Sequence, residues 1–367
     1  MNQARLLDLI RGMGIVLLLE MSPIQGLAQT ESPPATEQPN VQVPPQERAD
    51  FLTRMSKIPV PTEGCFTAQY PLEKWEKARC GKPPKYRNSL ARGKPRFVTV
   101  GGGIGYFAQV PGTISSATGS FDSVTVSKEY GTRFGGSALY PNTYTLQLNS
   151  NTFETRACNG QSNCFGWEQF IFSQSQCLPN TCIFIQYWLI DKKRPCPSAA
   201  WIYYPGSPTT ASGCYLNSAT AVVPPQPLTD LGELKLSGSV SDSDTVMLST
   251  ANGKVYAGKT SNLIDLRKGW SGAEFNLVGD CCDSEAHFTG GSNLAHRLST
   301  SYGSTTAPDC VTSFSGSTAE RNNLQLAGPC TSSGGSATSI AFSESGGEPL
   351  QVVREFVRRE REHKPRN

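Results

Sequence analysis

Residues 165–190 read FGWEQFIFSQSQCLPNTCIFIQYWLI, and this stretch decides the fold class. Two runs rich in aromatic and β-branched residues, 167–172 and 182–190, lie on either side of a short polar segment. Runs of this length and composition, bounded by turn-forming residues, are typical of β-strands. The stretch therefore predicts two strands that follow each other, and the spacing of Cys177 and Cys182 favours a disulfide at their connection.

The same pattern continues on both sides of this stretch, from about residue 96 onward. Short apolar runs are separated by Gly, Ser, Thr and Asn residues, and Asn252-Gly253 is typical of a two-residue hairpin turn. Long helical periodicity is missing from the sequence, and only 227–234 resembles a turn of helix. Many short strands at this spacing predict an all-β fold, an antiparallel β-sandwich or jelly roll, in one domain of residues 98–346. The expected strands are 96–100, 121–126, 143–148, 167–172, 182–190, 235–240, 245–250, 254–258, 273–278, 310–314, 322–328 and 339–344.

The chain has 12 cysteines and 3 histidines, which favours disulfides in an oxidising compartment over zinc sites. A bridge between adjacent residues is strained, so Cys281 and Cys282 are each expected to reach a different partner. The remaining cysteines allow local pairs that would brace the sandwich. Besides Cys177–Cys182, these pairs are Cys65–Cys80, Cys158–Cys164, Cys196–Cys214 and Cys310–Cys330.

The first 60 residues are expected to precede the folded body. Residues 1–28 combine Arg5 and Arg11 with an apolar stretch and small residues before a candidate cleavage point, as in a signal peptide. Residues 29–60 are rich in Pro, Glu, Thr and Gln, a composition typical of an extended or disordered linker. Together with the cysteines, the signal predicts a secreted or periplasmic protein, and the lack of an Asn-x-Ser/Thr sequon favours an exported bacterial one.

Charge is distributed unevenly along the 367 residues. Residues 1–100 carry 14 Lys or Arg and 9 Asp or Glu, whereas residues 101–350 carry 13 and 18. We interpret residues 61–97 as a basic N-terminal segment, either a solvated extension or a pro-segment that docks on the acidic body. Residues 347–367 form a basic C-terminal tail. The negative charge of the body predicts no nucleic-acid partner.

Several kinds of site are disfavoured by the sequence. No apolar run is long enough to span a membrane, and no Gly-x-Ser-x-Gly elbow is present. The GGGIG at 101–105 does not complete a dinucleotide-binding fingerprint. His287 and His296 are better explained as ordinary loop residues than as metal ligands, so neither a metal nor a cofactor is expected.

Three stretches set polar residues among large apolar ones, at 144–147, 166–170 and 273–275. Alternate residues of a strand face the same side, so each stretch can present its polar side chain on one face of a sheet. A glutamate there would be partly desolvated, with a raised pKa. Beside an amide, it could take a proton from water and later protonate a leaving group, while the amide stabilises the oxyanion.

The order of these stretches resembles the glutamic peptidases, the eqolisin family of acid endopeptidases. The resemblance extends over about residues 100–345 and implies a two-sheet β-sandwich of concanavalin-like architecture, with a basic pro-segment before an acidic mature enzyme. It implies that Gln147 and Glu274 form a catalytic dyad that hydrolyses polypeptides, and that Trp167 and Glu168 line the cleft. The motifs that carry it are Leu146-Gln147, Trp167-Glu168-Gln169-Phe170, Asp244-Thr245-Val246 and Ala273-Glu274-Phe275.

Two other functions stay open on the same scaffold. A glycoside hydrolase would use paired carboxylates such as Glu168 and Glu274. A non-catalytic sandwich would bind glycan or protein through exposed aromatic residues. The aromatic candidates are Trp167, Tyr187, Trp188, Trp201, Tyr203, Tyr204 and Trp270. In each case we expect a monomer without stable membrane insertion.

Overall fold

The computed structural model describes residues 44–85, 105–133, 136, 138–207, 210–281, 284–312 and 320–348. The expected signal peptide, the strand expected at 96–100 and nearly all of the C-terminal tail lie outside these residues. Within the described ranges, no helix has the length and apolar character needed to cross a membrane.

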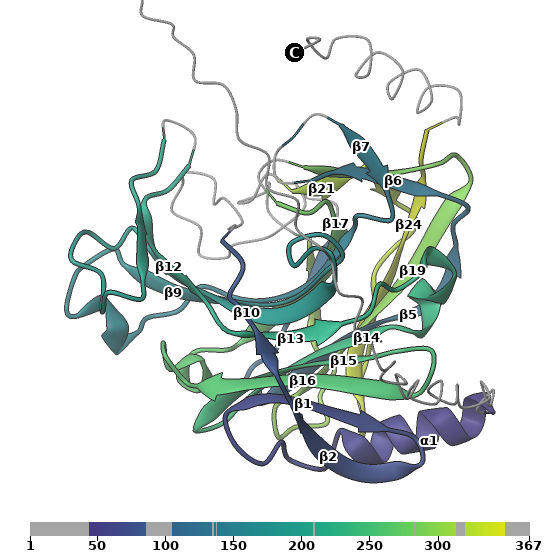
Figure 1. The fold of residues 1–367 in the computed structure, drawn as a ribbon, viewed down its shortest axis with the longest axis horizontal. Coiled ribbons are helices and arrows are strands. Elements are labelled where there is room, and N and C mark those ends of the chain that lie inside the picture. Colours follow the sequence, from purple (N-terminus) through teal and green to yellow (C-terminus); the bar gives the residue numbers. More distant parts are fainter. Residues whose placement is uncertain are drawn as a thin grey trace, which may run out of the picture. The chain divides into compact units, whose positions relative to one another are not determined.

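Ten strands form the first sheet (Figure 1). Their bounds are β1 Gly64–Gln69, β2 Leu72–Ala78, β5 Ser116–Thr125, β14 Lys235–Val240, β15 Ser243–Ser249, β16 Lys254–Ser261, β19 Ser292–Ser301, β22 Leu324–Leu326, β23 Thr331–Ser333 and β24 Thr338–Gly346. They lie in the order β2-β1-β16-β15-β14-β5-β19-β24-β22, with β23 beside β24.

Ten further strands form the second sheet, which carries the candidate site. Their bounds are β3 Cys80–Gly81, β4 Tyr106–Gln109, β8 Thr145–Ser150, β9 Phe165–Ser173, β10 Thr181–Ile190, β11 Ile202–Tyr204, β12 Gly213–Asn217, β13 Thr220–Val223, β17 Gly272–Val278 and β20 Asp309–Thr312. The order is β11-β12-β10-β9-β8-β17-β4-β20, while β13 pairs with β10 and with β3. Neighbouring strands in both large sheets are antiparallel.

The remaining elements are short. A small sheet has the order β21-β18-β6-β7, and three 3-10 helices connect strands within the described residues. Their bounds are β6 Glu129–Thr132, β7 Leu139–Pro141, β18 Glu285–Phe288, β21 Arg321–Asn322, η2 Arg156–Cys158, η3 Leu228–Glu233 and η4 Leu266–Lys268. One α-helix, α1, spans Pro45–Met55 in the described part of the chain and begins with a proline, whose fixed φ suits the first helical turn.

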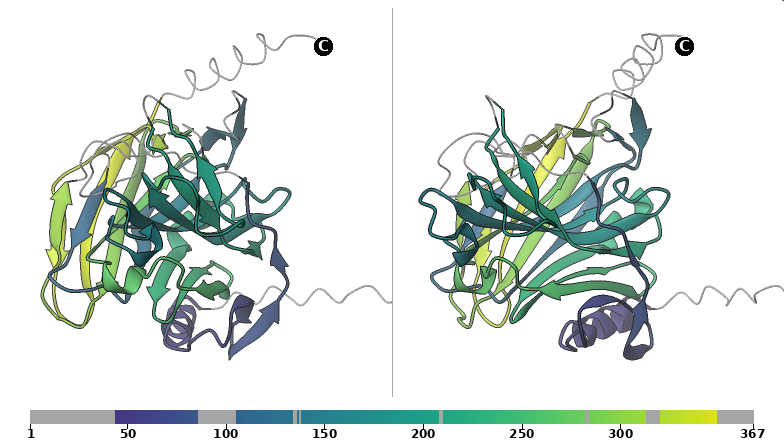
Figure 2. Two further views of the ribbon diagram at one scale, coloured as in Figure 1. Left: turned by 90° about the vertical axis from the view of Figure 1, so that its left-hand side faces the viewer. Right: turned by 60° about the vertical axis from the view of Figure 1, so that its left-hand side comes forward.

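The two large sheets pack face to face, and the core lies between them (Figure 2). On the second sheet Leu146, Leu148 and Phe170 point into this core, and Leu236 and Leu248 meet them from the first sheet. The layers approach closely at Gly238, where an added Cβ would lie 2.4 Å from the ring of Phe170. The all-β, antiparallel sandwich predicted from the sequence is therefore confirmed.

The local predictions within the body agree with the structure in part. The β15–β16 hairpin turns where Asn252-Gly253 predicted it, but through a longer loop than the expected two residues, because the N–H of Gly253 donates to the carbonyl oxygen of Thr250 and the N–H of Thr250 donates to that of Lys254. Gly253 has a φ of 73°, a conformation that glycine adopts without steric cost. The expected helical turn at 227–234 is η3. One long strand, β19, was not among the expected strands.

Five disulfides join pairs of cysteines that both lie in the described ranges, and all five were expected from their spacing. They are Cys65–Cys80, Cys158–Cys164, Cys177–Cys182, Cys196–Cys214 and Cys310–Cys330. Cys281 is also disulfide-bonded. Because the ten cysteines above are already paired with one another, the expectation that Cys281 reaches a distant partner is wrong. Cys282 lies outside the described residues.

The N-terminal part of the described chain differs from the expectation of a linker and a separate basic segment. Helix α1 lies within the range expected to be an extended linker. It is folded because Phe51 and Met55 pack with Trp75 in a small apolar cluster against β1 and β16. Strand β1 pairs with β16 in the first sheet, and β3 pairs with β13 in the second. The segment expected to precede the sandwich thus supplies strands to both of its sheets.

Candidate active site

Strands β8 and β17 are neighbours in the second sheet, and both alternate apolar and polar side chains. Phe275 of β17 points into the core, as do Leu146 and Leu148 of β8. The intervening residues therefore point to the opposite face. We call this opposite face the polar face, and its central residues are Gln147, Asn149, Gln169, Glu274 and Asn276.

The register of β8 and β17 brings the two expected dyad residues together. Gln147 lies directly opposite Asn276, and Asn149 lies directly opposite Glu274. Gln147 and Glu274 are therefore diagonal neighbours on one face, a separation that long side chains can bridge. Both side chains have an exposed fraction of 0%. The polar face thus sets a carboxyl group among carboxamides, away from bulk water.

Strand β9 adds Gln169 and Trp167 to the same face. Gln169 is opposite Asn149, and its Nε2 donates hydrogen bonds to Oδ1 of Asn149 at 2.9 Å and to Oε1 of Gln147 at 3.1 Å. Trp167 is two residues earlier on β9, is fully buried, and donates from its Nε1 to the carbonyl oxygen of Ser150 at 2.9 Å. Trp167 therefore lies on the side of the sheet expected for it.

Glu168 does not lie on this face, and the expectation that it lines the cleft is wrong. It follows Trp167 and precedes Gln169 in a regular strand, so its side chain points to the other side, into the sandwich. Glu168 and Glu274, the pair given as an example for a glycoside hydrolase, therefore do not lie on one side of the sheet as that reaction requires.

Inside the sandwich, Glu168 lies near Asp244 of β15 and Tyr187 of β10. Tyr187 donates a hydrogen bond to Oδ2 of Asp244 at 3.2 Å, while neither carboxyl oxygen of Glu168 has a hydrogen-bond partner among the described residues. Burial raises the pKa of Glu168 well above its usual range, and the nearby charge of Asp244 raises it further. Burial likewise raises the pKa of Asp244. This pair favours the protonated, neutral state.

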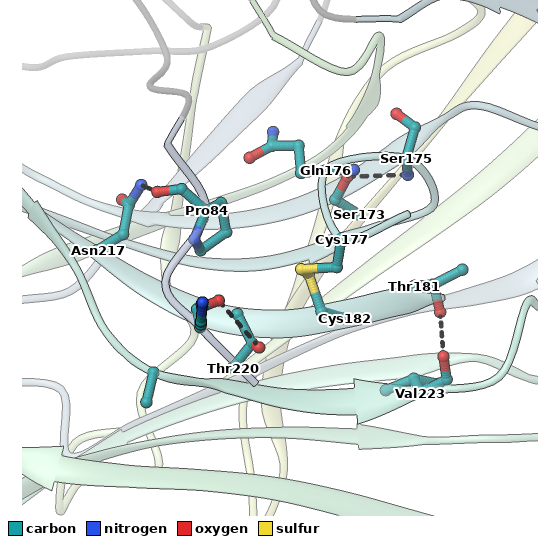
Figure 3. The surroundings of a disulfide bond; sticks show 12 residues. Pro84, Ser173, Ser175, Gln176, Cys177, Thr181, Cys182, Asn217, Thr220 and Val223 are labelled. Carbon is teal, nitrogen blue, oxygen red and sulfur yellow. Dashed lines mark hydrogen bonds between the residues drawn. A yellow bond between two sulfur atoms is a disulfide. The ribbon is translucent and has the colours of Figure 1, made fainter. Parts of the chain in front are cut away.

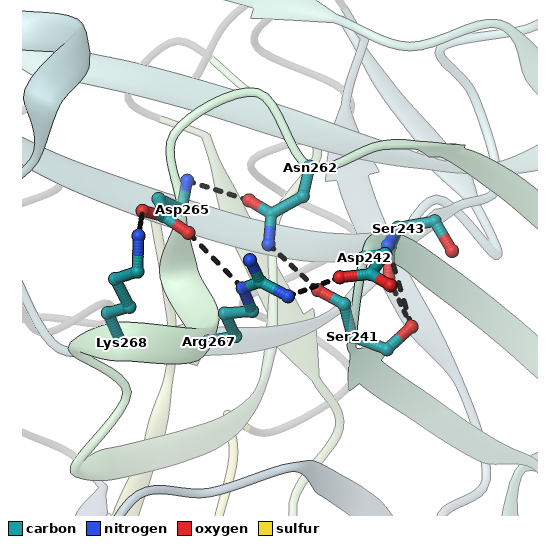
Figure 4. Close-up of polar contacts among 7 residues, drawn as sticks. All are labelled: Ser241, Asp242, Ser243, Asn262, Asp265, Arg267 and Lys268. Atoms are coloured by element: carbon teal, nitrogen blue, oxygen red, sulfur yellow. Dashed lines mark hydrogen bonds and ion pairs between the residues drawn. The ribbon is translucent and has the colours of Figure 1, made fainter.

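A polar network holds the chain that leads into β17 (Figure 4). Arg267 of η4 forms ion pairs with Asp242, in the β14–β15 turn, and with Asp265. Asp265 also binds Lys268, whose hydrogen bond lowers the pKa of the Asp265 carboxyl group. Asn262 donates from Nδ2 to the carbonyl oxygen of Ser241 at 3.2 Å. These contacts fasten the loop before β17 to the end of the first sheet.

A second group of amides continues the polar face toward β12. Nε2 of Gln186, opposite Gln169 on β10, donates to Oδ1 of Asn217 at 2.7 Å, and Nε1 of Trp188 donates to Oε1 of Gln186 at 2.9 Å. Nδ2 of Asn217 in turn donates to the carbonyl oxygen of Pro84 at 2.9 Å, near the Cys177–Cys182 disulfide (Figure 3). These amides are engaged with the protein itself.

Gly105 lies against the centre of the polar face. A Cβ added to this residue would lie 2.5 Å from Oδ1 of Asn276 and 3.5 Å from Oε1 of Glu274. Only a residue without a side chain leaves this approach open, which is a local reason for glycine at this position.

The aromatic residues considered for glycan binding divide into two groups. Four of them, Trp167, Tyr187, Trp188 and Trp270, are fully buried. Trp201, Tyr203 and Tyr204 are half-buried. The first two line an open pocket of about 460 Å³. The guanidinium carbon of Arg194 lies 4.7 Å from the ring centre of Tyr203 in the same pocket.

The two histidines considered as metal ligands lie apart from the polar face. His287 is on β18, 3.9 Å from Glu285, and His296 is buried on β19, 3.4 Å from Glu344 and stacked on Phe342. No group of three or more His, Cys, Asp or Glu residues suited to a metal ion occurs in the part of the chain that the structure describes.

Sequence reasoning did not select Asn149 or Gln169 as site residues. Asn149 could have been found by extending the alternation of β8 two residues beyond Gln147. For Gln169 the signal was ambiguous, because Glu168 and Gln169 are adjacent polar residues and only one can share a face with Gln147.

Comparisons with known proteins add little to this geometry. No protein-family model and no curated protein matches the chain. A crystal structure of scytalido-glutamic peptidase with a peptide-based transition-state analogue is similar at 12% identity, covering 66% of this chain and 100% of that chain, with a TM-score of 0.32. A likeness at this level does not show the function of this chain.

Proposed function

We propose that the chain is an acid-acting endopeptidase of the glutamic type, with Gln147 and Glu274 as its catalytic dyad and Trp167 beside the substrate. The observation that carries the proposal is the register of β8 and β17, which sets a buried carboxyl group diagonally next to a buried carboxamide. A general base and an oxyanion donor are the two groups that water-mediated peptide hydrolysis requires.

In the proposed reaction, the carboxylate of Glu274 takes a proton from a water molecule, and the water oxygen bonds to the carbonyl carbon of the peptide. The π electrons of the carbonyl move to its oxygen, which accepts a hydrogen bond from Nε2 of Gln147. Glu274, now a carboxylic acid, protonates the leaving nitrogen as the C–N bond breaks and the carbonyl re-forms. One water is consumed, and the scheme uses neither a metal nor a cofactor.

An acidic working pH is supported by carboxyl groups away from the dyad. Burial raises the pKa of Glu129 to about 8 and also raises those of Glu168 and Asp244, so all three are neutral in acid. The disulfides support a protein that acts in a secreted or periplasmic setting. We propose that it acts there as a monomer on polypeptides.

Cleavage of an unfolded protein substrate at about pH 4 tests the proposal. Glu274→Gln should lower kcat by about 10²–10⁴-fold without changing Tm, because it removes the proton acceptor and keeps the shape. Glu168→Gln is the matched control, with the same substitution on the opposite face of the same sheet. It should keep turnover, because Gln resembles the neutral form of the buried Glu168.

The assay should use the full chain, both intact and after a cut at a protease site engineered between Lys85 and Gly105. The cut tests whether the N-terminal segment restrains activity, as a pro-segment would. If neither form cleaves the substrate, or if Glu274→Gln cleaves as fast as wild type, the proposal is wrong.

The pocket beside Trp201 favours glycan or protein binding as the second candidate function. Aromatic rings next to a guanidinium group suit a sugar or a peptide that carries a negative charge. Such binding would survive Glu274→Gln and would be lost in Trp201→Ala, as measured by titration calorimetry with acidic oligosaccharides and acidic peptides. Equal affinity of Trp201→Ala and wild type for these ligands would exclude this pocket as their binding site.

A further inference from the structure

The side chain of Gln169 joins the two carboxamides of β8. Its NH2 group has two hydrogens, and Nε2 lies 3.1 Å from Oε1 of Gln147 and 2.9 Å from Oδ1 of Asn149. All three side chains have an exposed fraction of 0%. One buried NH2 group therefore fixes the orientation of two amides at once.

This orientation decides which atoms the amides present to β17. Because the oxygen and the NH2 group leave opposite sides of a planar carboxamide, turning both oxygens toward β9 turns both NH2 groups away from it. Nε2 of Gln147 and Nδ2 of Asn149 have no hydrogen-bond partner among the described residues. A buried donor without a partner costs about 1–3 kcal/mol, so two together are best explained by an acceptor that binds there.

The strand opposite supplies the reacting group. Asn149 is the register partner of Glu274 on β17, and Gln147 is the diagonal neighbour of the same residue. The two residues whose NH2 groups have no partner are therefore both cross-strand neighbours of the residue on which the proposed hydrolysis depends.

We propose that Asn149 is a second oxyanion donor beside Gln147, and that Gln169 is the positioning residue that aims both donors. The inference rests on the proposed peptidase function. When water adds to the peptide carbonyl, the new oxyanion accepts hydrogen bonds from Nε2 of Gln147 and Nδ2 of Asn149. When the C–N bond breaks, the oxygen returns to a carbonyl and both bonds weaken.

Kinetics of three variants test the proposal. Asn149→Ala should lower kcat by about 10²–10³-fold with KM within about threefold, because an oxyanion donor acts in the transition state. Gln169→Leu should also lower kcat more than it changes KM. Gln169→Glu is almost isosteric, and the dependence of its kcat on pH tests whether residue 169 orients the two donors.

A protonated Glu at position 169 can still donate one hydrogen bond, whereas an ionised one only accepts. Ionisation should therefore turn both NH2 groups toward β9, and kcat of Gln169→Glu should fall with rising pH earlier than that of wild type. The register partners of Gln169 are Asn149 and Gln186, which do not titrate, and Glu274 on β17 is common to both proteins. Gln186→Glu, the same change one strand away, should leave the pH profile of kcat as in wild type.

A measurement without substrate separates this inference from the function on which it rests. In wild type, nuclear Overhauser contacts should join the NH2 protons of Asn149 to the side chain of Glu274, and they should disappear in Gln169→Glu at neutral pH. Contacts to β9 in wild type would overturn the aiming role, whatever the activity. An active wild type whose pH profile is unchanged by Gln169→Glu, or whose kcat is unchanged by Asn149→Ala, would overturn it as well. Inactive wild type would count against the peptidase function alone.

Discussion

The two faces of the second sheet both bury polar side chains, but they do so in opposite ways. On the core face, Glu168 lies near Asp244 of the first sheet, and neither carboxyl oxygen of Glu168 has a hydrogen-bond partner among the described residues. Asp244 accepts hydrogen bonds from Tyr187 and from the backbone of Leu263, and burial favours the neutral forms of both carboxyl groups. On the polar face, Glu274 neighbours Gln147 and Asn149, whose NH2 groups have no hydrogen-bond partner among the described residues. Burial of a carboxyl group is thus common to both faces, and the proposed site differs from the core pair in these two donor groups.

The largest expected effect is the dependence of stability on pH, which tests the buried carboxyl groups, including Glu129 on β6 of the small sheet. Burial raises the pKa of Glu129 from 4.5 to about 8, which corresponds to a difference on the order of 5 kcal/mol between acid and alkaline solution. A raised pKa in the folded state means that the unfolded chain ionises first as pH rises. We therefore expect Tm to be highest below about pH 4 and to fall up to about pH 8.

The measurement is thermal unfolding across this range for wild type and for Glu129→Gln. The variant should show a smaller fall in Tm, because its side chain does not ionise. A Tm that rises from acid to neutral pH would contradict the assignment of these buried groups as neutral.

Adjacent residues of β17 give the next test of the difference between the faces. Phe275 is fully buried in the core and contacts Phe121, whereas Glu274 points to the polar face. Phe275→Ala should lower the free energy of unfolding by about 3–5 kcal/mol. Glu274→Gln should leave it nearly unchanged. Urea denaturation measures both, and a larger loss for Glu274→Gln would reverse the roles given to the two faces.

The amides near β12 show whether part of the polar face is structural. Gln186→Leu would leave Nε1 of Trp188 and Oδ1 of Asn217 without the bonds that Gln186 provides. We expect a loss of about 1–3 kcal/mol in the free energy of unfolding, with turnover retained. Loss of turnover at full stability would instead place Gln186 in the active site and enlarge it.

The smallest effect is expected outside both faces. Arg267→Ala removes ion pairs to Asp242 and Asp265 from the loop before β17, where the Arg267 side chain is 44% exposed. Exposed ion pairs contribute less than about 1 kcal/mol and weaken in salt. A drop in kcat without a drop in Tm would show that this loop also positions Glu274.

Much of the fold was predictable because local patterns and tertiary structure agree. In β8 and β17, alternation of apolar and polar residues predicted the strands and which residues share a face, whereas Gln147 and Glu274 were selected by the resemblance to glutamic peptidases. The disulfides were predictable because all five join cysteines that are 5–20 residues apart in sequence.

Other features were not predictable for physical reasons. In β9 both faces are buried, so alternation cannot say whether Glu168 or Gln169 faces the core. Strand β19 was missed because it has few β-branched or aromatic residues, although its alternate residues are buried and this alternation was a signal that could have identified it. Strand β1 and helix α1 were hidden by a proline-rich and basic composition, and they form because a distant strand, β16, pairs with β1 and completes the cluster around Phe51.

The two N-terminal strands have a consequence for the covalent structure of a processed protein. The Cys65–Cys80 bridge closes within the N-terminal part, and none of the other four bridges reaches back to it. A backbone cut after Lys85 would therefore create two polypeptides without a covalent link. They would be held together by the pairing of β1 with β16 and of β3 with β13, by the cluster around Phe51, and by side-chain contacts such as the ion pair of Arg48 with Glu233. Such a heterodimer would keep its mass in native chromatography and separate in denaturant without reductant.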